Sequence, residues 1–325
     1  MKILLASPID ADAVEVLAQQ HHVENVIHAP EEKIKSLMHD CEAMIFRSGI
    51  QISAELMGLA PNLKLLVRAG SGVDNIDLPY VRERGLELVR IPEPGAQAVA
   101  ELSFAFMLGL SRNLFAADSS MRQGHWLKYE LEGYLLKDKT LGIVGMGNIG
   151  GRVANMGVAW GMDVIGCIEH PTEERRLHFA EKGIRLLDFE QVVAQADYLS
   201  IHVPLKDSTR NLISAQVISS MKPGSYLINL ARGGIVDELA LLLEMTNGNR
   251  LRGAALDVHK LEGEGKFSPL VNLPNVILTP HVGAMAIDAQ RQIGQRVIEV
   301  INSFDVEPNS FRSNGRSIQM PDITI

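Results

Sequence analysis

The chain has 325 residues, enough for two domains of ordinary size, and 46% of them are hydrophobic and 22% charged, as is typical of soluble globular proteins. Its formal net charge of −8 argues against nucleic acid as a main partner, because no broad basic surface is expected. The two cysteines lie far apart in apolar stretches, so they predict no metal site and no disulfide, and a reducing cytoplasm is the expected compartment. No apolar stretch approaches the ~18 residues that a membrane span needs.

Short apolar runs alternate with helical patterns along nearly the whole chain. The first run, Ile3 to Ala6, is followed at once by Ser-Pro and acidic residues, so it predicts a strand and not a signal peptide. Continuous runs of this length, separated by helices, predict parallel strands buried on both faces of a doubly wound α/β fold. The predicted strands lie within residues 2–7, 43–48, 64–70, 140–147, 163–168, 198–204, 225–231, 253–258 and 275–281.

Two long helical patterns suggest where the domains meet. Residues 97–115 form a nearly all-apolar pattern, which suits a helix buried between two layers or two domains. A second pattern at about 285–304 follows the last strand. We therefore expect one domain of residues 1–97, joined by about 288–325, and a second domain of residues 98–287. The polar tail after Pro308 has a weak strand pattern at its end.

A glycine-rich turn follows the strand that begins the second domain. Gly145, Gly147 and Gly150 form the spacing G-x-G-x-x-G between that strand and an amphipathic helix. Gly145 permits the tight turn, Gly147 lets the backbone approach a pyrophosphate, and Gly150 lets the helix pack closely on the strand. The helix N-terminus favours the anion. The sequence thus predicts a dinucleotide-binding domain.

The next strand should end in an acid that binds the adenosine ribose. Ile168 occupies that place, and Glu169 follows it. Glu169 is a candidate for the role, and its charge would repel a 2′-phosphate, which favours NAD over NADP. Arg175 and Arg176 lie close enough in sequence that NADP is not excluded.

Charged or titratable residues stand at the ends of many predicted strands. In open α/β sheets, ligands bind outside the carboxyl ends of the strands, so such a set predicts a site. For the histidines among them, the alternative is a hydrogen-bonded structural residue. The set consists of Arg47, Arg68, His202, Arg232, Asp257 and His281.

The chain resembles the D-isomer-specific 2-hydroxyacid dehydrogenases, and the segment VRAGSGVDNIDL is most similar to the phosphoglycerate dehydrogenase branch. The resemblance covers about residues 40–300. It depends on RAGSGVDNID, VAEL, GMGNIG, HVPLKDSTRNLI, MKPGSYLINLARGGIVDE, AALDV and LTPHVG, in this order. It implies a flavodoxin-like substrate-binding domain and a Rossmann NAD-binding domain, both doubly wound parallel sheets, with an active-site cleft between them. It implies an NAD-dependent oxidoreductase acting on the CH–OH group, without a catalytic metal.

The resemblance assigns three catalytic residues. Arg232 resembles the arginine that binds the substrate carboxylate and polarises the 2-oxo group, for which its planar fork is suited. His281 matches the acid–base histidine, and Glu262 matches the acid paired with it, which stabilises the imidazolium. Gly263 stands where the family usually has proline, and Glu264 is a less well spaced candidate for the acid. Ala286 stands where the family usually has threonine.

Further roles follow from the same resemblance. Asp257 resembles the residue that bonds the nicotinamide amide, and residues 71–73 resemble the loop whose N–H groups bind the substrate carboxylate. His202 is expected to border the cofactor, with a purely structural role as the alternative, and the remaining histidines to be structural or solvent-facing. The implied dinucleotide contacts are Asn148, Ile149, His202, Pro204, Thr209 and Ala231; the implied carboxylate loop is Ser71, Gly72 and Val73.

The far end of the substrate is expected to be anionic. Arg47 and Arg68 match arginines that contact the substrate phosphate in phosphoglycerate dehydrogenases, and Lys128 matches a basic residue supplied by the partner subunit. Three cations suit a dianion; the alternative is that both arginines pair with acids. Residues 112–138 resemble the family's dimer arm, so a homodimer is expected. No appended regulatory domain is expected, which argues against serine feedback.

Other functions remain open at this point. Within the family, hydroxypyruvate or glyoxylate reductase and phosphite dehydrogenase are alternatives, whereas formate dehydrogenase usually has glutamine in place of Glu262. A different class is a dinucleotide-sensing corepressor, which would bind the cofactor with negligible turnover. Arg47 and Arg68 favour an enzyme, because a sensor needs no basic pair at the substrate end.

Overall fold

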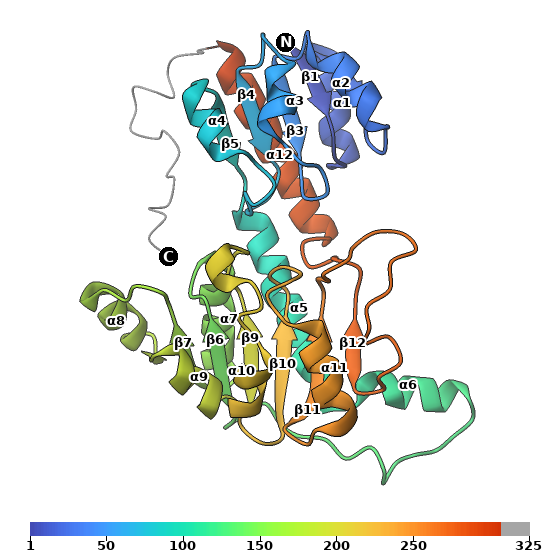
Figure 1. The fold of residues 1–325 in the computed structure, drawn as a ribbon, viewed down its shortest axis with the longest axis vertical. Coiled ribbons are helices and arrows are strands. Elements are labelled where there is room, and N and C mark those ends of the chain that lie inside the picture. Colours follow the sequence, from blue (N-terminus) through green and yellow to red (C-terminus); the bar gives the residue numbers. More distant parts are fainter. Residues whose placement is uncertain (307–325) are drawn as a thin grey trace. The chain divides into compact units, whose positions relative to one another are not determined.

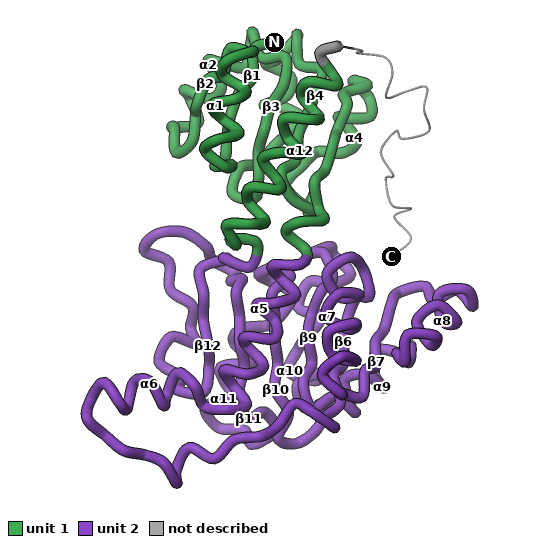
Figure 2. The backbone as a smooth tube through the Cα atoms, turned by 180° about the vertical axis from the view of Figure 1, so that it is seen from behind, with its two compact units in different colours: residues 1–96, 284–323 green, residues 97–283, 324–325 purple. Residues whose placement is uncertain are grey.

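The computed structural model describes residues 1–306 of the chain. These residues divide into two compact units, shown in Figure 2. Unit 1 contains Met1–Ala96 and the described residues from Ala284 onward, and unit 2 contains Gln97–Gly283. The polar tail after Pro308, with its weak strand pattern, lies outside the described residues.

Unit 1 is built on a five-stranded parallel sheet in the order β2-β1-β3-β4-β5. This is the flavodoxin-like order, which reverses between β1 and β3, and it confirms the predicted fold class for this half of the chain. β3 and β4 are buried along their whole length, as their continuous apolar runs predict. The strands are β1 (Lys2–Leu5), β2 (His22–Asn25), β3 (Ala43–Phe46), β4 (Leu65–Arg68) and β5 (Glu87–Arg90).

The C-terminal helix α12 (Ile287–Val306) completes the core of unit 1. Its apolar residues at positions 293, 297, 300, 301 and 304 recur at helical spacing and are buried against the sheet. Gly294 allows a close approach to α1, because a Cβ there would lie 2.8 Å from that of Ala13. The other helices of the unit are α1 (Ala11–Gln20), α2 (Glu31–Met38), α3 (Ala54–Gly58) and α4 (Leu78–Glu83).

Unit 2 is built on a seven-stranded parallel sheet in the order β12-β11-β10-β9-β6-β7-β8. The strand order reverses between β6 and β9, as in the Rossmann fold, which confirms the second predicted doubly wound sheet. The strands are β6 (Thr140–Val144), β7 (Asp163–Cys167), β8 (Ile184–Leu186), β9 (Tyr198–Ile201), β10 (Ser225–Asn229), β11 (Leu251–Leu256) and β12 (Val276–Leu278).

Helices lie on both faces of this second sheet (Figure 1). One large apolar cluster joins the sheet to the helices on one face, so the carboxyl ends of the strands are held in place by a packed core. The helices are α5 (Glu93–Ser111), α6 (Leu114–Arg122), α7 (Asn148–Ala159), α8 (Glu173–Ala180), α9 (Phe189–Gln195), the short 3₁₀ helix η1 (Asp207–Thr209), α10 (Ala215–Ser220) and α11 (Glu238–Asn247).

Two local predictions differ from the structure. The strands β2, β5 and β8 were not predicted, and all three lie at sheet edges, where partial exposure admits polar residues. The helix predicted for residues 97–115 instead spans Glu93–Ser111. It begins early because Pro94 is tolerated in a first turn, and it ends near Asn113, which has the left-handed φ of 51°.

Within residues 1–306, no single helix is both long and apolar enough to cross a membrane. The helices α5 and α6 satisfy that test only as a pair, by length and composition, and the pair is bent by 63°.

Candidate active site

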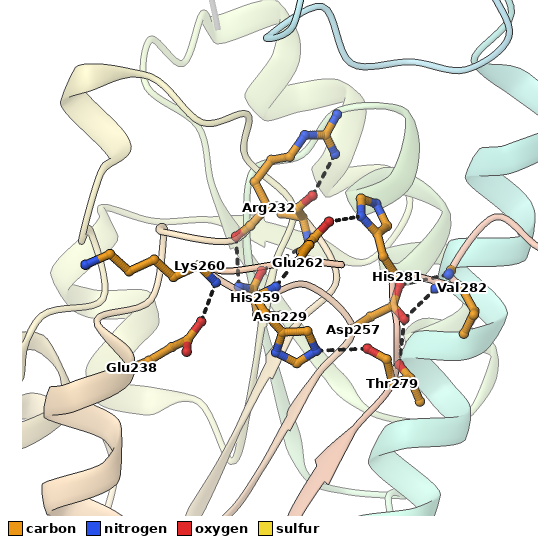
Figure 3. A network of polar contacts seen from close by, with 12 residues as sticks. Asn229, Arg232, Glu238, Asp257, His259, Lys260, Glu262, Thr279, His281 and Val282 are labelled. Carbon is orange, nitrogen blue, oxygen red and sulfur yellow. Dashed lines mark hydrogen bonds and ion pairs between the residues drawn. The ribbon is translucent and has the colours of Figure 1, made fainter. Parts of the chain in front are cut away.

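Three of the predicted site residues follow three neighbouring strands of unit 2. β10, β11 and β12 are parallel and adjacent, and Arg232, Asp257 and His281 follow them in turn. Parallel strands present their carboxyl ends at one edge, so the loops that carry these residues meet there (Figure 3).

The backbone of His281 is held in a conformation that few residues adopt. Its φ is 55°, in the left-handed region. Its N–H donates to the carbonyl oxygen of Asp257 at 2.7 Å, and the Asp257 carboxylate accepts from Thr279 Oγ1 at 2.5 Å and from the N–H groups of Val282 and Gly283, both at 2.8 Å. Asp257 is 1% exposed. This buried carboxylate therefore orders the loop on both sides of His281, a feature associated with functional sites.

The His281 side chain is paired with Glu262. His281 Nδ1 lies 2.9 Å from Glu262 Oε2, with the two side chains 31% and 40% exposed. Glu262 Oε1 accepts the backbone N–H of His259 at 3.1 Å, which fixes the carboxylate. Burial raises the pKa of Glu262, but the hydrogen bond and charge of His281 outweigh it, so the net pKa lies below its usual value. With Nδ1 on the carboxylate, Nε2 is the ring nitrogen of His281 that this contact leaves available.

Close packing holds the Arg232 loop against the next strand. Asn229 at the end of β10 donates from Nδ2 to the carbonyl oxygen of Arg232 at 3.1 Å and accepts the N–H of Ala231 at 3.0 Å. A Cβ on Gly233 would lie 1.8 Å from the carbonyl oxygen of His259, so only glycine fits here. Arg232 Nη1 donates to the carbonyl oxygen of Ala231 at 2.7 Å.

His259 is part of this network, although the sequence pattern did not single it out. It follows Asp257 by two residues, and its Nε2 lies 2.9 Å from the carbonyl oxygen of Thr279. With Glu262 and His281 it lines a pocket of about 580 Å³. The signal available in the sequence was its place two residues after a strand-end acid. Glu264, the alternative acid, also lines this pocket, but the contact to His281 comes from Glu262.

The glycine loop has the geometry that a dinucleotide needs. Gly145 has a φ of 96°, and a Cβ there would lie 2.7 Å from the carbonyl oxygen of His202. A Cβ on Gly150 would lie 2.0 Å from the carbonyl oxygen of Gly145. Gly147, by contrast, faces open space and precedes α7, whose first residues are Asn148 and Ile149. Two glycines thus allow close packing, and the third leaves room for a phosphate at a helix N-terminus.

The loop after β9 meets the glycine loop at the point where the strand order reverses. His202 lies there with its Nε2 at 2.8 Å from Ser200 Oγ, and burial lowers its pKa to about 3, so the ring is neutral at physiological pH. Thr209 donates from Oγ1 to the carbonyl oxygen of Pro204 at 2.7 Å and so closes the loop that follows. Ala231 is buried at the end of the next strand.

The residues at the end of β7 differ in exposure. Ile168 is partly buried, and Glu169 is exposed to solvent. Of the two nearby arginines, Arg175 donates from Nη2 to the carbonyl oxygen of Met146 in the glycine loop at 3.4 Å. Arg176 donates instead to the carbonyl oxygen of Leu186 at the end of β8, at 3.1 Å. Only Arg175 lies at the dinucleotide loop.

In unit 1, Arg47 lies where the strand order of the sheet reverses. Its N–H donates to Oγ of Ser7, which follows β1, at 2.9 Å. Its guanidinium donates to Gln290 Oε1 at 2.8 Å and to the Sδ of Met285 at 3.4 Å, and burial lowers its pKa. In folds of this type, the reversal point is the usual ligand site.

The predicted carboxylate loop of unit 1 is supported by two arginines. Arg68, 4% exposed, donates from Nε to the carbonyl oxygen of Gly72 at 2.8 Å. Arg90 donates to the carbonyl oxygen of Ser71 at 3.2 Å, and the carbonyl oxygen of Val73 accepts the N–H of Ile76 at 3.1 Å. Arg90 was not predicted as a site residue. It pairs in register with Arg68 across two strands, a relation that the sequence alone does not reveal.

Lys128 lies in the segment between α6 and β6. Its side chain is exposed, with Nζ 5.2 Å from the centre of the Tyr129 ring. Among residues 1–306 no group of three or more His, Cys, Asp or Glu side chains is arranged to hold a metal ion.

Residues 104–283 match the family model "D-isomer specific 2-hydroxyacid dehydrogenase, NAD binding domain". The chain belongs to the D-isomer-specific 2-hydroxyacid dehydrogenase family. The match confirms the predicted resemblance, and with it an oxidoreductase family and a domain for NAD. The open space at Gly147, at the N-terminus of α7, fits such a cofactor.

Several known proteins are similar to this chain over most of its length. A D-3-phosphoglycerate dehydrogenase of Methanocaldococcus jannaschii is 37% identical over 93% of this chain, which spans 57% of that relative's length. A hydroxypyruvate reductase of Thermotoga maritima is 33% identical over 92% of this chain and 97% of its own length. The structure of a D-lactate dehydrogenase from Aquifex aeolicus with NAD and lactic acid has a TM-score of 0.83, 27% identity, and coverage of 97% and 98% of the two chains.

Proposed function

We propose that the chain is an NAD-dependent D-2-hydroxyacid dehydrogenase that interconverts a small 2-oxo acid and its D-2-hydroxy acid. The observation that carries the proposal is the 2.9 Å contact between His281 and Glu262, beside the Arg232 loop at the carboxyl edge of a dinucleotide-binding sheet. In this proposal residues 98–287 bind the dinucleotide, and residues 1–97 with about 288–325 bind the substrate. NAD(H), when bound, supplies or accepts the hydride at carbon 2 of the substrate.

The side chains at the sheet edge move the proton and hold the substrate. His281 donates its Nε2 proton to the 2-oxo oxygen as the hydride reaches carbon 2, and removes the same proton in the reverse direction. Glu262 keeps Nδ1 protonated and stabilises the imidazolium. Arg232 binds the substrate carboxylate with its planar guanidinium, and the same charge stabilises the developing alkoxide. Asp257, saturated by its loop contacts, keeps His281 in place. It would border the nicotinamide amide of a bound NAD(H).

The distal end of the substrate is proposed to be anionic and to bind in unit 1. Arg47 at the reversal point of the sheet and Arg68 on the neighbouring strand supply guanidinium groups at one sheet edge. The carbonyl oxygens of Ser71 and Gly72 accept from arginine side chains, which orients the peptide groups of the loop. The N–H groups of this loop are proposed to bind the substrate carboxylate. A substrate similar to 3-phosphoglycerate has both negative ends.

A hydroxypyruvate or glyoxylate reductase is the second candidate. It is favoured by the Thermotoga maritima hydroxypyruvate reductase, whose length this chain matches almost completely. The chemistry at His281 is the same in both candidates. They differ only in whether Arg47 and Arg68 bind a substrate group.

The test is oxidation of NADH and of NADPH by the purified chain with phosphohydroxypyruvate, sulfopyruvate, hydroxypyruvate, glyoxylate and pyruvate. Highest kcat/KM with a dianionic acid supports the proposed distal site. If kcat/KM is highest with hydroxypyruvate or glyoxylate, the proposed reaction stands, but the proposed distal anion site is refuted. If the chain reduces NAD with phosphite and acts on no 2-oxo acid, the substrate is phosphite and not a 2-hydroxy acid. Tight NADH binding without any turnover favours a dinucleotide sensor.

A homodimer is also proposed, on the basis of a long apolar segment. Residues 114–135 expose large apolar side chains, with Trp126 75% and Tyr129 80% exposed, which is unusual for a monomer surface. Light scattering after size exclusion tests the assembly. A monomer at micromolar concentration would remove the proposal and also the proposed role of Lys128 toward a partner's substrate. The exposed set comprises Leu114, Phe115, Met121, Trp126, Leu127, Tyr129, Tyr134 and Leu135.

A further inference from the structure

His259 is linked by hydrogen bonds to both residues of the Glu262–His281 pair (Figure 3). Its backbone N–H donates to Glu262 Oε1 at 3.1 Å. Its ring Nε2 lies 2.9 Å from the carbonyl oxygen of Thr279, and the same oxygen accepts the backbone N–H of His281 at 3.1 Å. A carbonyl oxygen has two lone pairs, so it accepts both bonds.

The ring of His259 acts as a hydrogen-bond donor. A carbonyl oxygen can only accept, so the ring nitrogen that faces Thr279 carries a proton. The other nitrogen, Nδ1, is buried and has no hydrogen-bond partner among residues 1–306. Within this part of the chain, a change that removes the donor from the ring therefore removes the bond to Thr279 and no other bond of the ring.

The bond from His259 supports a turn that carries backbone strain. His281 has a φ of 55°, and a residue with a side chain stays in this region only where its surroundings hold it. Its N–H is shared between the carbonyl oxygens of Asp257 and Thr279. Because the ring of His259 fixes the second of these carbonyl groups, it also fixes the direction in which the turn presents the His281 side chain.

His259 is itself attached to the packed part of unit 2. The N–H of the next residue, Lys260, donates to Oε1 of Glu238 at 2.6 Å, and Glu238 is a buried residue at the start of α11. The carbonyl oxygen of His259 packs closely against Gly233, in the loop that carries Arg232. His259 therefore joins the flexible end of its loop to a rigid support.

The loop beyond Glu262 is loosely packed. Residues 263–267 are exposed. Gly263 and Gly265 have φ values of 118° and 72°, and a Cβ on either would meet nothing within 4 Å. Glycines in open space restrain the chain little. The position of the Glu262 carboxylate therefore depends on the contacts that precede it, and the His259 N–H is bonded to the carboxylate directly.

We propose that His259 is a positioning residue for the reaction. Its N–H orients the Glu262 carboxylate, and its ring, through the Thr279 carbonyl group, orients His281. His259 acts through this pair and needs no contact with the substrate. The inference rests on the proposed role of His281 as the acid–base residue.

Two substitutions separate the ring of His259 from its donor. His259→Phe keeps a ring and loses the donor, whereas His259→Gln loses the ring and keeps an N–H group at about the reach of Nε2. The assay is the single-turnover rate of NADH oxidation with the most active 2-oxo acid of the panel above. His259→Phe should lower this rate by about tenfold, because misaligned groups react slowly, and His259→Gln should stay within about threefold of the wild type. Neither should change the Kd of NADH by more than about twofold.

The same change in a His281→Asn background distinguishes positioning from a merely structural role. If His259 acts through His281, His259→Phe should lower the remaining rate by less than about twofold, because residues that act as a unit are not additive. An equal loss of rate in both backgrounds would overturn the inference. So would a wild-type rate in His259→Phe, or an equal loss in His259→Phe and His259→Gln.

A second measurement does not need turnover. The proton between His281 Nδ1 and the Glu262 carboxylate should give a low-field NMR signal, identified by its loss in His281→Asn. The signal should persist in His259→Gln and be lost by exchange with water in His259→Phe. A signal that persists in both variants, or is absent from the wild type, would overturn the inference.

The two measurements also separate this inference from the proposed function. A wild type that is inactive on every 2-oxo acid refutes the proposed function, whereas the NMR signal still decides whether His259 aligns the pair. If His259→Phe does not fold, His259→Met, which also lacks a donor, takes its place in both measurements.

Discussion

The buried carboxylate of Asp257 provides the sharpest test of how the loop around His281 is held. Asp257→Asn keeps the shape of the side chain and replaces one oxygen by an NH₂ group. In the structure one carboxylate oxygen accepts from Thr279 and Val282, and the other accepts from Gly283. Whichever way the amide turns, a backbone N–H faces an NH₂ group.

The expected cost follows from these contacts. One hydrogen bond to a charged group is lost, at about 1.5–3 kcal/mol, and a buried donor is left without an acceptor, at about 1–3 kcal/mol. The free energy of unfolding should therefore fall by about 2.5–6 kcal/mol. For a unit of this size that lowers the thermal midpoint by about 5–24 °C. The kcat should fall as well, because the backbone of His281 is bonded to Asp257.

Asp237→Asn is the control, measured by circular dichroism in the same buffer. Asp237 caps α11 and accepts the N–H groups of Leu239 and Ala240 through the same oxygen, each at 3.1 Å. Asparagine keeps that oxygen and caps a helix about as well as aspartate, so the midpoint should hardly change. A midpoint for Asp257→Asn within about 2 °C of this control would refute the reasoning.

Four further predictions concern the site. His281→Asn, which suits the left-handed backbone, should lower kcat by about a hundredfold or more and leave the Kd of NADH unchanged. Arg47→Ala should raise KM for phosphohydroxypyruvate far more than for glyoxylate; equal effects would contradict an anion site. Gly150→Ala should abolish NADH binding, because its Cβ meets a carbonyl oxygen at 2.0 Å, whereas Gly151→Ala, which faces open space, should not. The pKa of Glu262 is lowered on folding, so its contribution to stability is complete above about pH 4.3 and is lost as the pH falls through the folded-state pKa. Acid titrations of wild type and Glu262→Gln should therefore converge at low pH.

Some of the site was readable from the order of residues along the chain. The glycine loop requires glycine at positions that follow one another closely, and its three roles appear in the structure as a positive φ, an open backbone and a close helix contact. The Glu262–His281 contact joins residues 19 positions apart, and it was expected from the family resemblance and not from spacing. What spacing showed was only that each stands after an apolar strand run.

The class of fold and the dinucleotide loop can be predicted from the order of residues alone, because strands buried on both faces must be apolar throughout and a phosphate loop must be glycine-rich. Edge strands such as β2 and β8 escape that rule, since exposure relaxes the need for apolar residues. Which strand ends are neighbours becomes known only from the folded chain. The register of β4 with β5 brings Arg90 beside Arg68, and α8 turns Arg175 toward the glycine loop but Arg176 away from it. Such pairings depend on crossovers and helix packing between distant segments, which no local pattern encodes.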